Sequence, residues 1–592
     1  MPVHNVAPYL ESALLSVLYQ EFQDFELIIV DDASTDASRT IIDMYADLDA
    51  RIRVLSLEHN SLGGAGIPSN LGMRAARGRY LGFVDSDDVV LHGAFARLIA
   101  TADRDDAEVV IGGFATFSED ERIVEPAYDI PRGVGIPRDR IISATSHPEL
   151  LELSPVPWRK LYRMSFMEKF GIEYPEGDYF FEDNPLHWAV LSLADRVVLI
   201  DEIVSHHRMG REGQTMGSME HRKGAFAHHL TTALQAVLGT SGERRDALLV
   251  AYVDRLYASR WVIRQQSHPG AQAMLAKRFG VLFDRAIAAG TRIPVAMKRT
   301  VDSYRGSYPT HDLTVVVTAF NCAPKVKRTL DSLLAVRRID LDILVVDDGS
   351  TDGTLPLLRD YESAHANVHV FSQPHRGAGR ARNSVIPLMT GQWALFLDAG
   401  DRVSAEALSR CVEEAVQSDV DLVLFGARNA VDTSTARAVH AIAQDAAAKH
   451  DSIAWNRLVR TSHLQDDNIF FGGSSPYEDV LFHWHTVAST RRIGYMAMNI
   501  VERTEFTQKR LTKSISAAAG DALHDSLWFA QERLDAHVDF ADLQSEWLEY
   551  IAEVLRTTRA ALSAGEAERF DARSSTLWAD IKQRGAVSPP DL

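Results

Sequence analysis

Residues 341–352 read LDILVVDDGSTD, and residues 25–36 read FELIIVDDASTD. In both stretches a run of leucine, isoleucine and valine ends at a pair of aspartates, and a Ser-Thr-Asp segment follows. An apolar run bounded by turn-forming residues is typical of a buried strand. The near identity of two stretches so far apart in the chain indicates a duplicated module.

Two further motifs occur in both halves of the chain, in the same order and at nearly the same spacing. The first is an apolar run that ends in VDSDD (residues 84–88) or LDAGD (residues 397–401). The second is Glu-Asp followed by His-Trp, at residues 182–188 and 478–484. The sequence therefore predicts two copies of one module, and the question is whether both copies carry out chemistry.

The bulk properties describe a large globular protein. A chain of 592 residues is too long for one hydrophobic core, and 46% hydrophobic with 24% charged residues is an ordinary composition. The net charge of −19 argues against nucleic acid as a partner, because phosphate binding requires clustered lysine and arginine. The two cysteines, Cys322 and Cys411, exclude a disulfide scaffold and fit a reducing compartment.

The sequence gives no sign of export or membrane insertion. It contains no run of about eighteen apolar residues, so no membrane span is predicted. The N-terminus carries no basic region followed by a hydrophobic stretch, so no secretory signal is predicted. We therefore expect a cytoplasmic protein. Attachment to the inner face of the membrane through a partner stays open, as does the oligomeric state.

Strand-like and helix-like patterns alternate in the second half of the chain. They fall at Leu313–Val317, Ala323–Leu334, Ile343–Val346, Leu355–Glu362 and Val368–Phe371. This alternation predicts an α/β fold with a doubly wound, mostly parallel sheet and helices on both faces. Ligands of such sheets bind beyond the carboxyl ends of the strands, where the aspartate motifs lie.

We expect each α/β domain to be followed by a helical segment. The expected parts are a first α/β domain (1–216), a helical segment with its linker (217–305), a second α/β domain (306–516) and a C-terminal helical segment (517–592). Helical patterns at Ala225–Leu238 and Ala247–Gln265 and the polar linker Ser303–Asp312 support this division. The helical segments could dimerise, extend an acceptor groove or pack on the sheet, and the sequence leaves this choice open.

The first copy lacks a match for the opening strand of the second. Asn5 aligns with Asn321, so nothing in the first copy corresponds to Leu313–Val317. Loss of a central parallel strand removes ladder hydrogen bonds and apolar cover from its neighbours. We therefore expect that Met1 is not the natural start and that several upstream residues are absent.

The carboxylates suggest recognition of a nucleotide and a cation. A carboxylate of Asp31-Asp32 or Asp347-Asp348 can accept a hydrogen bond from a nucleobase imide N–H, although the following Ser-Thr-Asp segment can also simply cap a helix. Asp85, Asp87 and Asp88 repel one another, and a divalent cation such as Mg²⁺ or Mn²⁺ would relieve this repulsion and clamp a diphosphate. The alternative is a solvated acidic turn.

Two other segments carry weaker signals. Glycine-rich residues 63–66 and 376–383 allow close approach of the backbone to a ligand, and the helix N-termini that follow attract anions. In the Glu-Asp motifs, a carboxylate can deprotonate an acceptor hydroxyl as a general base. Capping of a helix N-terminus by these acids is the alternative. His187 and His483 receive no assignment.

Taken together, this ordered set of motifs resembles the inverting family-2 glycosyltransferases of the GT-A fold. Residues 2–5 (PVHN), 157–162 (PWRKLY) and 207–215 (HRMGREGQT) also resemble that family. The resemblance extends over roughly 1–216 and 313–516, and it is specific only as a set. It implies two tandem GT-A domains, similar to those of bacterial capsule or cell-wall glycan synthases.

The resemblance also implies an activity and a set of residues. The activity is transfer of sugars with inversion from nucleotide-sugar donors, usually UDP-sugars, to a glycan or lipid-linked glycan, with Mn²⁺ or Mg²⁺ as cofactor. The implied catalytic residues are the bases Asp183 and Asp479 with Glu182 and Glu478 beside them. The implied donor-binding residues are Asn5, Asp31, Asp32, Asn70, Asp85, Asn321, Asp347, Asp348, Arg382, Asn383 and Asp398. The implied metal ligands are Asp85, Asp87, Asp398 and Asp401.

Each copy departs from the family pattern at one place. The first copy has Ser69 where the family and the second copy have an arginine, Arg382. The second copy has Gly400 where the first has Asp87. We favour two active sites, with altered metal coordination in the second. The alternatives are one active domain with a binding domain, or transfer of a nucleotide-activated non-sugar such as a polyol phosphate.

Overall fold

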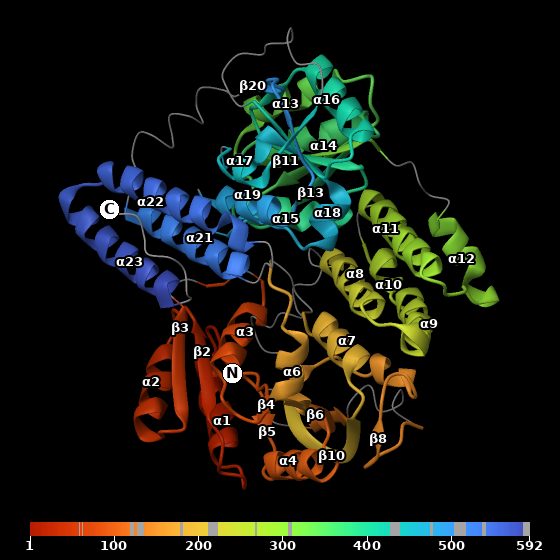
Figure 1. Ribbon diagram of the computed structural model, residues 1–592, viewed down its shortest axis with the longest axis vertical. Helices are drawn as coiled ribbons and strands as arrows, with labels where there is room; N and C mark the ends of the chain where they lie inside the picture. Colours follow the sequence, from red (N-terminus) through yellow and green to blue (C-terminus); the bar gives the residue numbers. More distant parts are fainter. Residues whose placement is uncertain are drawn as a thin grey trace. The chain divides into compact units, whose positions relative to one another are not determined.

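The computed structural model divides into two compact units, Met1–Ser307 and Tyr308–Leu592 (Figure 1). The residues that it describes are 1–57, 60–61, 63–118, 123–126, 135–177, 182–210, 223–266, 269–305, 311–426, 439–450, 452–473, 477–502, 517–535 and 540–583. The expected domain boundaries at 216 and 516 and residues 211–215 of the HRMGREGQT motif fall outside these ranges, so what the sequence predicts for them stays a prediction. Among the described residues, no helix combines the length and apolar character needed to cross a membrane.

The second unit is built on an eight-stranded sheet of strand order β13-β12-β11-β14-β18-β16-β19-β17. The strands are β11 (Leu313–Ala319), β12 (Leu341–Asp347), β13 (Val368–Ser372), β14 (Trp393–Asp398), β16 (Leu422–Phe425), β17 (His440–Ile442), β18 (Arg457–Arg460) and β19 (Ile493–Met496). A separate pair joins β15 (Arg402–Val403) to β20 (Val501–Glu502). Neighbours from β13 to β14 are parallel, whereas β18 runs antiparallel to β14 and β16.

Helices cover both faces of this sheet. The helices are α13 (Ala323–Leu334), α14 (Thr354–Ala364), α15 (Ala378–Val385), α16 (Ala405–Gln417), α17 (Gln444–Ala448), α18 (Thr461–Asp466) and α19 (Glu478–Ala488). Side chains of α13, α14 and α16 share one core with Leu313, Val315 and Val317. On the other face, Phe396 of β14 packs edge-on against Phe482 of α19. The predicted α/β fold with a doubly wound, mostly parallel sheet is confirmed.

The first unit repeats this strand order but as two sheets. One is the parallel set β1 (Pro2–Val3), β2 (Leu27–Asp32) and β3 (Ile52–Leu57). The other has the order β4 (Tyr80–Gly82), β9 (Lys160–Arg163), β6 (Val109–Phe117), β10 (Val197–Arg208) and β5 (Val89–Val90), with β7 (Ile123–Pro126) on β6 and β8 (Ile141–Ile142) on β10. Its helices are α1 (Ala7–Leu18), α2 (Ser38–Leu48), α3 (Gly66–Ala75), α4 (Ala94–Arg104), α6 (Met164–Phe170) and α7 (Asp183–Leu193).

The break between the two sheets of the first unit lies at β1. Its pairing of Pro2 with Val30 and Val3 with Asp31 is the pairing that Thr318 and Ala319 make at the end of β11. The opening strand of the first unit thus consists of the two residues that match the end of β11, with no counterpart of Leu313–Val317 in the described part of the chain, as the sequence predicted. In the second unit β11 pairs with β14 over six residue pairs. Among the described residues of the first unit, no such pairing joins β1 to β4.

A helical segment follows each α/β part. In the first unit it comprises α8 (Lys223–Leu238), α9 (Gly242–Ala258), α10 (Trp261–Arg264), α11 (Pro269–Ala288) and α12 (Val295–Arg305). In the second it comprises α21 (Ala517–Asp535), α22 (Gln544–Ala560) and α23 (Ala564–Gln583). Two expectations are corrected: the helix expected over Ala247–Gln265 is interrupted between α9 and α10, and the start of the expected linker belongs to α12.

Both helical segments pack on the helix that begins at the Glu-Asp motif. Trp188 of α7 lies edge-on to Tyr252 of α9, and their ring centroids are 5.9 Å apart, a separation typical of favourable aromatic pairs. Trp484 of α19 lies 5.0 Å from Trp547 of α22 in the same way. The burial of these tryptophans fixes each helical segment next to the acidic end of α7 or α19.

Candidate active sites

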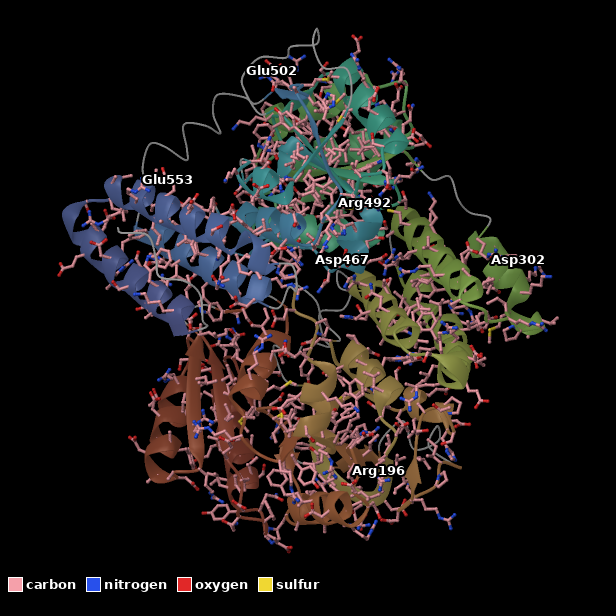
Figure 2. The ribbon with its side chains drawn as sticks, in the orientation of Figure 1. Arg196, Asp302, Asp467, Arg492, Glu502 and Glu553 are labelled. Carbon is pink, nitrogen blue, oxygen red and sulfur yellow. The ribbon has the colours of Figure 1, made fainter. Side chains whose placement is uncertain are left out.

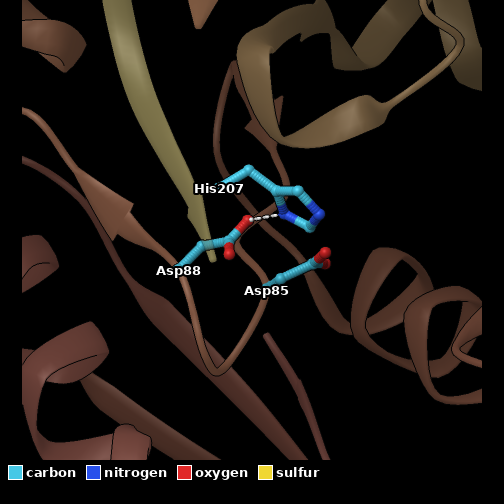
Figure 3. A group of neighbouring side chains, drawn as sticks. All are labelled: Asp85, Asp88 and His207. Atoms are coloured by element: carbon cyan, nitrogen blue, oxygen red, sulfur yellow. Dashed lines mark hydrogen bonds and ion pairs between the residues drawn. The ribbon is translucent and has the colours of Figure 1, made fainter. Parts of the chain in front are cut away.

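The acidic motif of the first unit brings together residues from two distant segments. Asp85 and Asp88 lie in the turn between β4 and β5, and His207 lies on β10, which pairs with β5. Nδ1 of His207 is 2.8 Å from Oδ2 of Asp88 (Figure 3), and the other Asp88 oxygen accepts the backbone N–H of Arg208 at 2.9 Å. One ligand atom from each of Asp85, Asp88 and His207 can lie within 4.8 Å of the others.

Charge accumulates in this cluster. Burial, followed by the nearby carboxylates of Asp88, Asp87 and Asp183, raises the pKa of Asp85 well above its usual value. Burial lowers the pKa of His207, but its hydrogen bond to Asp88 and the surrounding carboxylates outweigh this effect and raise the pKa to about 9. The cluster thus attracts positive charge.

These residues fit a divalent cation. Two carboxylates and one imidazole are a donor set that first-row divalent ions such as Mn²⁺ accept. The structure groups Asp88 and His207 with Asp85, whereas Asp87 is buried outside this group. In the sequence, His207 stands out only as part of the motif HRMGREGQT. Its place opposite the acidic turn follows from the β5–β10 pairing, which sequence spacing does not reveal.

The Glu-Asp motif of the first unit lies at the start of α7. Oε1 of Glu182 accepts the backbone N–H of Ala65 at 2.7 Å, at the N-terminus of α3. Burial, followed by the charge of Glu182, raises the pKa of Asp183 to about 7. A carboxylate with a pKa in this range is suited to general-base catalysis near neutral pH. His187 is buried, and its Nδ1 lies 2.9 Å from Nζ of Lys160, which agrees with a structural role.

The remaining expected donor residues of the first unit hold loops at the sheet edge. Asp32 accepts hydrogen bonds from the backbone N–H and the hydroxyl of Ser61, both at 2.7 Å. Oδ1 of Asn5 accepts the backbone N–H of Thr35 at 2.7 Å. Asp31 accepts from the backbone N–H of Ser34 at 3.2 Å. These side chains lie together at the carboxyl ends of β1 and β2, the edge of the sheet at which the sequence predicts donor binding.

The second unit repeats this layout with different partners. Asp348 accepts from Nε2 of Gln373 at 2.8 Å and from the backbone N–H groups of Arg376 and Gly377 at 2.9 and 2.8 Å. Oδ1 of Asn321 accepts the backbone N–H of Thr351 at 2.8 Å. The buried Oδ1 atom of Asp347 has no hydrogen-bond partner among the described residues. Asp347 is 0% exposed, so this oxygen is enclosed by the protein.

The two expected donor asparagines clamp the chain that leads to the Glu-Asp motif. Asn70 accepts the backbone N–H of Tyr174 at 2.8 Å and donates to its carbonyl oxygen at 3.0 Å. Asn383 makes the same pair of bonds to Phe471, at 2.8 and 3.0 Å. Both asparagines are buried. Their side chains act on the protein backbone and set the position of the motif.

The acidic motif of the second unit contains a built-in cation. The guanidinium of Arg382, which is only 3% exposed, donates to Asp398 at 2.6 Å and to Asp479 at 2.8 Å. It therefore joins the carboxylate at the end of β14 to the one at the start of α19. The second oxygen of Asp479 accepts the backbone N–H of Ala454 at 3.0 Å. Burial, followed by the charge of Asp479, raises the pKa of Glu478 to about 7.

Gly400 and Asp401 complete the turn after β14. Gly400 has a φ of 111°, in the region that favours glycine, and its N–H donates to the hydroxyl of Thr329 at 2.8 Å. Asp401 is 1% exposed. The acidic motif of the second unit thus has one carboxylate fewer than that of the first, because Gly400 stands in place of Asp87. The second unit also has Arg382 where the first has the buried Ser69.

Comparison with known proteins adds curated relatives from bacteria. The glycosyltransferase EpsJ of Bacillus subtilis (strain 168), itself uncharacterised, is 36% identical over 203 residues, which span 34% of this chain and 58% of EpsJ. The poly(ribitol-phosphate) β-N-acetylglucosaminyltransferase TarS of Staphylococcus aureus (strain Mu50 / ATCC 700699) is 25% identical over 44% of each chain. The chain therefore spans less than two thirds of the length of these relatives.

A solved structure and a family profile also match. The crystal structure of S. aureus TarS 1–349 in complex with UDP superposes with a TM-score of 0.42 at 20% identity, over 52% of this chain and 86% of that one. The sequence profile described as glycosyl transferase family 2 matches residues 1–170 and 314–478, one stretch in each unit and more than half of the chain together. This chain therefore belongs to glycosyl transferase family 2.

Proposed function

We propose that the chain is a glycosyltransferase with two active sites that moves sugars from nucleotide-sugar donors, UDP-sugars among them, to a glycan acceptor with inversion. The observation that carries the proposal is the convergence, in each unit, of the acidic motif with the Glu-Asp motif. In the second unit Arg382 contacts both Asp398 and Asp479. In the first unit the Asp183 carboxylate lies close enough to Asp85 for its charge to raise the pKa of Asp85.

In the first unit, Asp183 would remove the proton from the acceptor hydroxyl that attacks the anomeric carbon. Its raised pKa, about 7, makes it a stronger base than an exposed aspartate while it remains partly ionised at neutral pH. Asp85, Asp88 and His207 would hold a divalent cation, which neutralises charge on a diphosphate leaving group. Glu182 would keep the N-terminus of α3 against α7 and so fix the position of Asp183.

In the second unit, Asp479 would be the base and Arg382 would supply positive charge. Asp479 is oriented by Arg382 on one oxygen and by the N–H of Ala454 on the other. A buried guanidinium is permanently charged and can bind two phosphate oxygens in parallel. Arg382 would therefore take over charge neutralisation that in the first unit falls to a metal ion.

The biological setting is proposed from the named relatives. They include a teichuronic acid biosynthesis glycosyltransferase, a poly(ribitol-phosphate) N-acetylglucosaminyltransferase and a chondroitin synthase. We place the chain in the synthesis of a surface or cell-wall polysaccharide, on the cytoplasmic side of the membrane, with peripheral attachment through a partner. UDP-N-acetylglucosamine is the first donor to test, since TarS 1–349 was solved with it.

A second candidate function assigns turnover to the first unit alone. The ion pair between Arg382 and Asp479 occupies the carboxylate that would act as the base in the second unit. On this alternative, the second unit binds donor or acceptor without chemistry.

The test is a screen of nucleotide-sugars with the full chain, in which the released nucleotide is measured. We expect Asp183→Asn to remove one transfer step and Asp479→Asn another. The controls are Asp47→Asn and Asp360→Asn, because both are exposed carboxylates on helices of the same two units. Unchanged products in both Asn variants would contradict the proposal, whereas an effect of Asp183→Asn alone would favour the second candidate. Release of CMP in place of UDP would point to transfer of a polyol phosphate.

A further inference from the structure

A pocket of about 640 Å³ lies within the second unit, between α22 and the segment that follows α17. Its lining consists mainly of charged and hydroxyl-bearing side chains. The lining residues used below are Lys449, Ser452, Glu546, Glu549, Tyr550 and Glu553. The labelled Glu553 in Figure 2 lies on α22. The pocket is formed by one wall of the α/β part and one wall of the helical segment.

The helical wall is rigidly attached to the helix that starts at the Glu-Asp motif. Tyr550 and Trp547 of α22 lie 5.4 and 5.0 Å from Trp484 of α19, measured between ring centroids. Trp484 and Trp547 are among the largest fully buried side chains of the chain. Because cores are packed at nearly crystalline density, α22 cannot move independently of α19.

The pocket also adjoins the proposed base through its other wall. Ser452 lines the pocket, and two residues further on the N–H of Ala454 donates to Asp479 at 3.0 Å. Tyr550 and Ser452 both line the pocket and share a side-chain hydrogen bond. Burial raises the pKa of Tyr550 to about 12. The hydrogen bond to Ser452 lowers this pKa, whereas the charges of Tyr477 and Asp479 raise it further. The phenol thus stays protonated beside Asp479 and can donate a hydrogen bond.

The charges of the lining select against an anionic occupant. Glu546, Glu549 and Glu553 lie at successive turns of α22, on one face. Lys449 lies 3.8 Å from Glu546, and Arg556 lies 2.7 Å from Glu553, so both cations face carboxylates already present. The exposed carboxylate of Glu549 has no hydrogen-bond or ion-pair partner among the described residues. Free carboxylate oxygens accept hydrogen bonds from hydroxyl groups and repel phosphate.

We propose that this pocket is an acceptor subsite of the second unit, which takes an uncharged, hydroxyl-rich glycan and presents its end to Asp479. The proposal rests on the function proposed above and assigns a role to the C-terminal helical segment. Hydroxyls of the glycan donate to the glutamates of α22, and the Tyr550–Ser452 pair lies on the side of Asp479. A chain of phosphodiesters meets the carboxylates of α22 and is excluded.

The experiment measures binding of the full chain, with UDP and Mn²⁺ present, to immobilised hexasaccharides of glucose, galactose and N-acetylglucosamine and to a ribitol-phosphate hexamer. We expect a neutral hexasaccharide to bind best. Glu549→Lys should weaken that binding about 10-fold or more, and Glu549→Gln by about 3-fold, because a hydrogen bond to a charged acceptor is lost in both and charge is reversed in the first. The control is Glu568→Lys, a charge reversal at an exposed position of α23.

The outcomes separate the subsite from the function itself. Three results would overturn the subsite. The ribitol-phosphate hexamer could bind best, no neutral hexasaccharide could bind, or wild type and both Glu549 variants could bind equally. Glu549 is exposed, so its variants should fold, and an unfolding curve that matches wild type verifies this. Release of UDP from UDP-sugars in the presence of the same acceptors, whose hydroxyls take the sugar, is measured in parallel. If the wild type releases no UDP with any of the donors, the proposed function is overturned, whichever hexasaccharides bind.

Discussion

The two acidic centres are built on the same strand order but balance their negative charge differently. In the first unit, Asp85 and Asp88 face His207, and the arginine position is taken by Ser69. In the second unit, Arg382 lies between Asp398 and Asp479. One centre gathers carboxylates that attract a cation from solution, and the other contains its cation as a side chain.

This difference has a physical reason in the energetics of buried charge. Like charges in a low-dielectric site cannot all ionise unless a positive charge lies between them. An exchangeable ion supplies that charge only when it is bound, whereas a buried arginine is always charged. The loss of a carboxylate at Gly400 and the presence of Arg382 therefore act in the same direction, because both make the charge of the second centre less negative.

The largest expected effect concerns removal of metal. On the proposed function, Asp479→Asn in the full chain leaves transfer by the first unit, and Asp183→Asn leaves transfer by the second. We expect dialysis against EDTA to lower the transfer rate of Asp479→Asn about 100-fold or more, because a metal ion contributes several kcal/mol of charge stabilisation. The transfer rate of Asp183→Asn should fall by less than about 3-fold, since Arg382 remains in place in the second unit. Rates are measured by UDP release, with Mn²⁺ added back as the control.

Equal sensitivity of the two variants to EDTA would contradict the comparison. If the rate of Asp479→Asn recovers with Mn²⁺ but not with Na⁺ at the same ionic strength, ionic strength is not the cause.

The next effect concerns Arg382 itself. Arg382→Met removes the buried guanidinium from between Asp398 and Asp479, whose side chains are 31% and 22% exposed, and loss of hydrogen bonds to charged groups costs about 1.5–3 kcal/mol of stability. The unfolding transition of the second unit should therefore shift to lower temperature, and Mn²⁺ should now raise it, as the second centre becomes similar to the first. Calorimetry of the full chain with and without Mn²⁺ measures both shifts. Arg328→Met, at an exposed position of α13, is the control.

The fold was predictable from the sequence to the extent that it depends on local apolar patterns. Helix Ala323–Leu334 was predicted with its observed bounds, and the strand predicted at Leu313–Val317 extends two residues further, to Ala319. The expected single helix over Ala247–Gln265 was wrong at Ser259 and Arg260, where no glycine or proline marks the break. Apolar periodicity continues across this interruption, so tertiary packing decides it.

The candidate sites were predictable only as sets of residues. The sequence indicated Arg382, Asp398 and Asp479 separately, but their ion pairs depend on how β14 and α19 meet. His207 joins Asp85 and Asp88 because β10 pairs with β5, a contact between segments far apart in the chain. The pocket beside α22 likewise requires the packing of Trp484 on Trp547. Long-range packing of this kind leaves no signal in the local pattern.

A smaller effect tests how closely each unit holds its Glu-Asp motif. In Gly379→Ala the new Cβ would collide with the carbonyl oxygen of Gly472 and lie 2.9 Å from Cβ of Glu478. In the matched Gly66→Ala it would lie 3.3 Å from the carbonyl oxygen of Pro175. We expect a loss of about 1–3 kcal/mol for Gly379→Ala, as for overpacked sites. Gly66→Ala should stay within about 1 kcal/mol of wild type, because higher helix propensity offsets the tight contact. Thermal unfolding of both variants measures this, and equal losses would contradict it.

The smallest effect concerns the place of the proton in the second unit. Burial and the charge of Asp479 raise the pKa of Glu478 from 4.5 to about 7, so between these values the folded protein binds a proton that the unfolded chain releases. Stability contributed by this proton is present below pH 4.5 and is lost as pH rises through 7. Glu478→Gln imitates the protonated form, so it should match wild type near pH 5 and exceed it by on the order of 2 kcal/mol at pH 8. Calorimetry of the full chain between pH 5 and 8 measures the difference, with Glu568→Gln on α23 as the exposed control. A Glu478→Gln curve parallel to wild type would place the proton elsewhere, and the second centre would then resemble the first, where Asp183 carries the raised pKa.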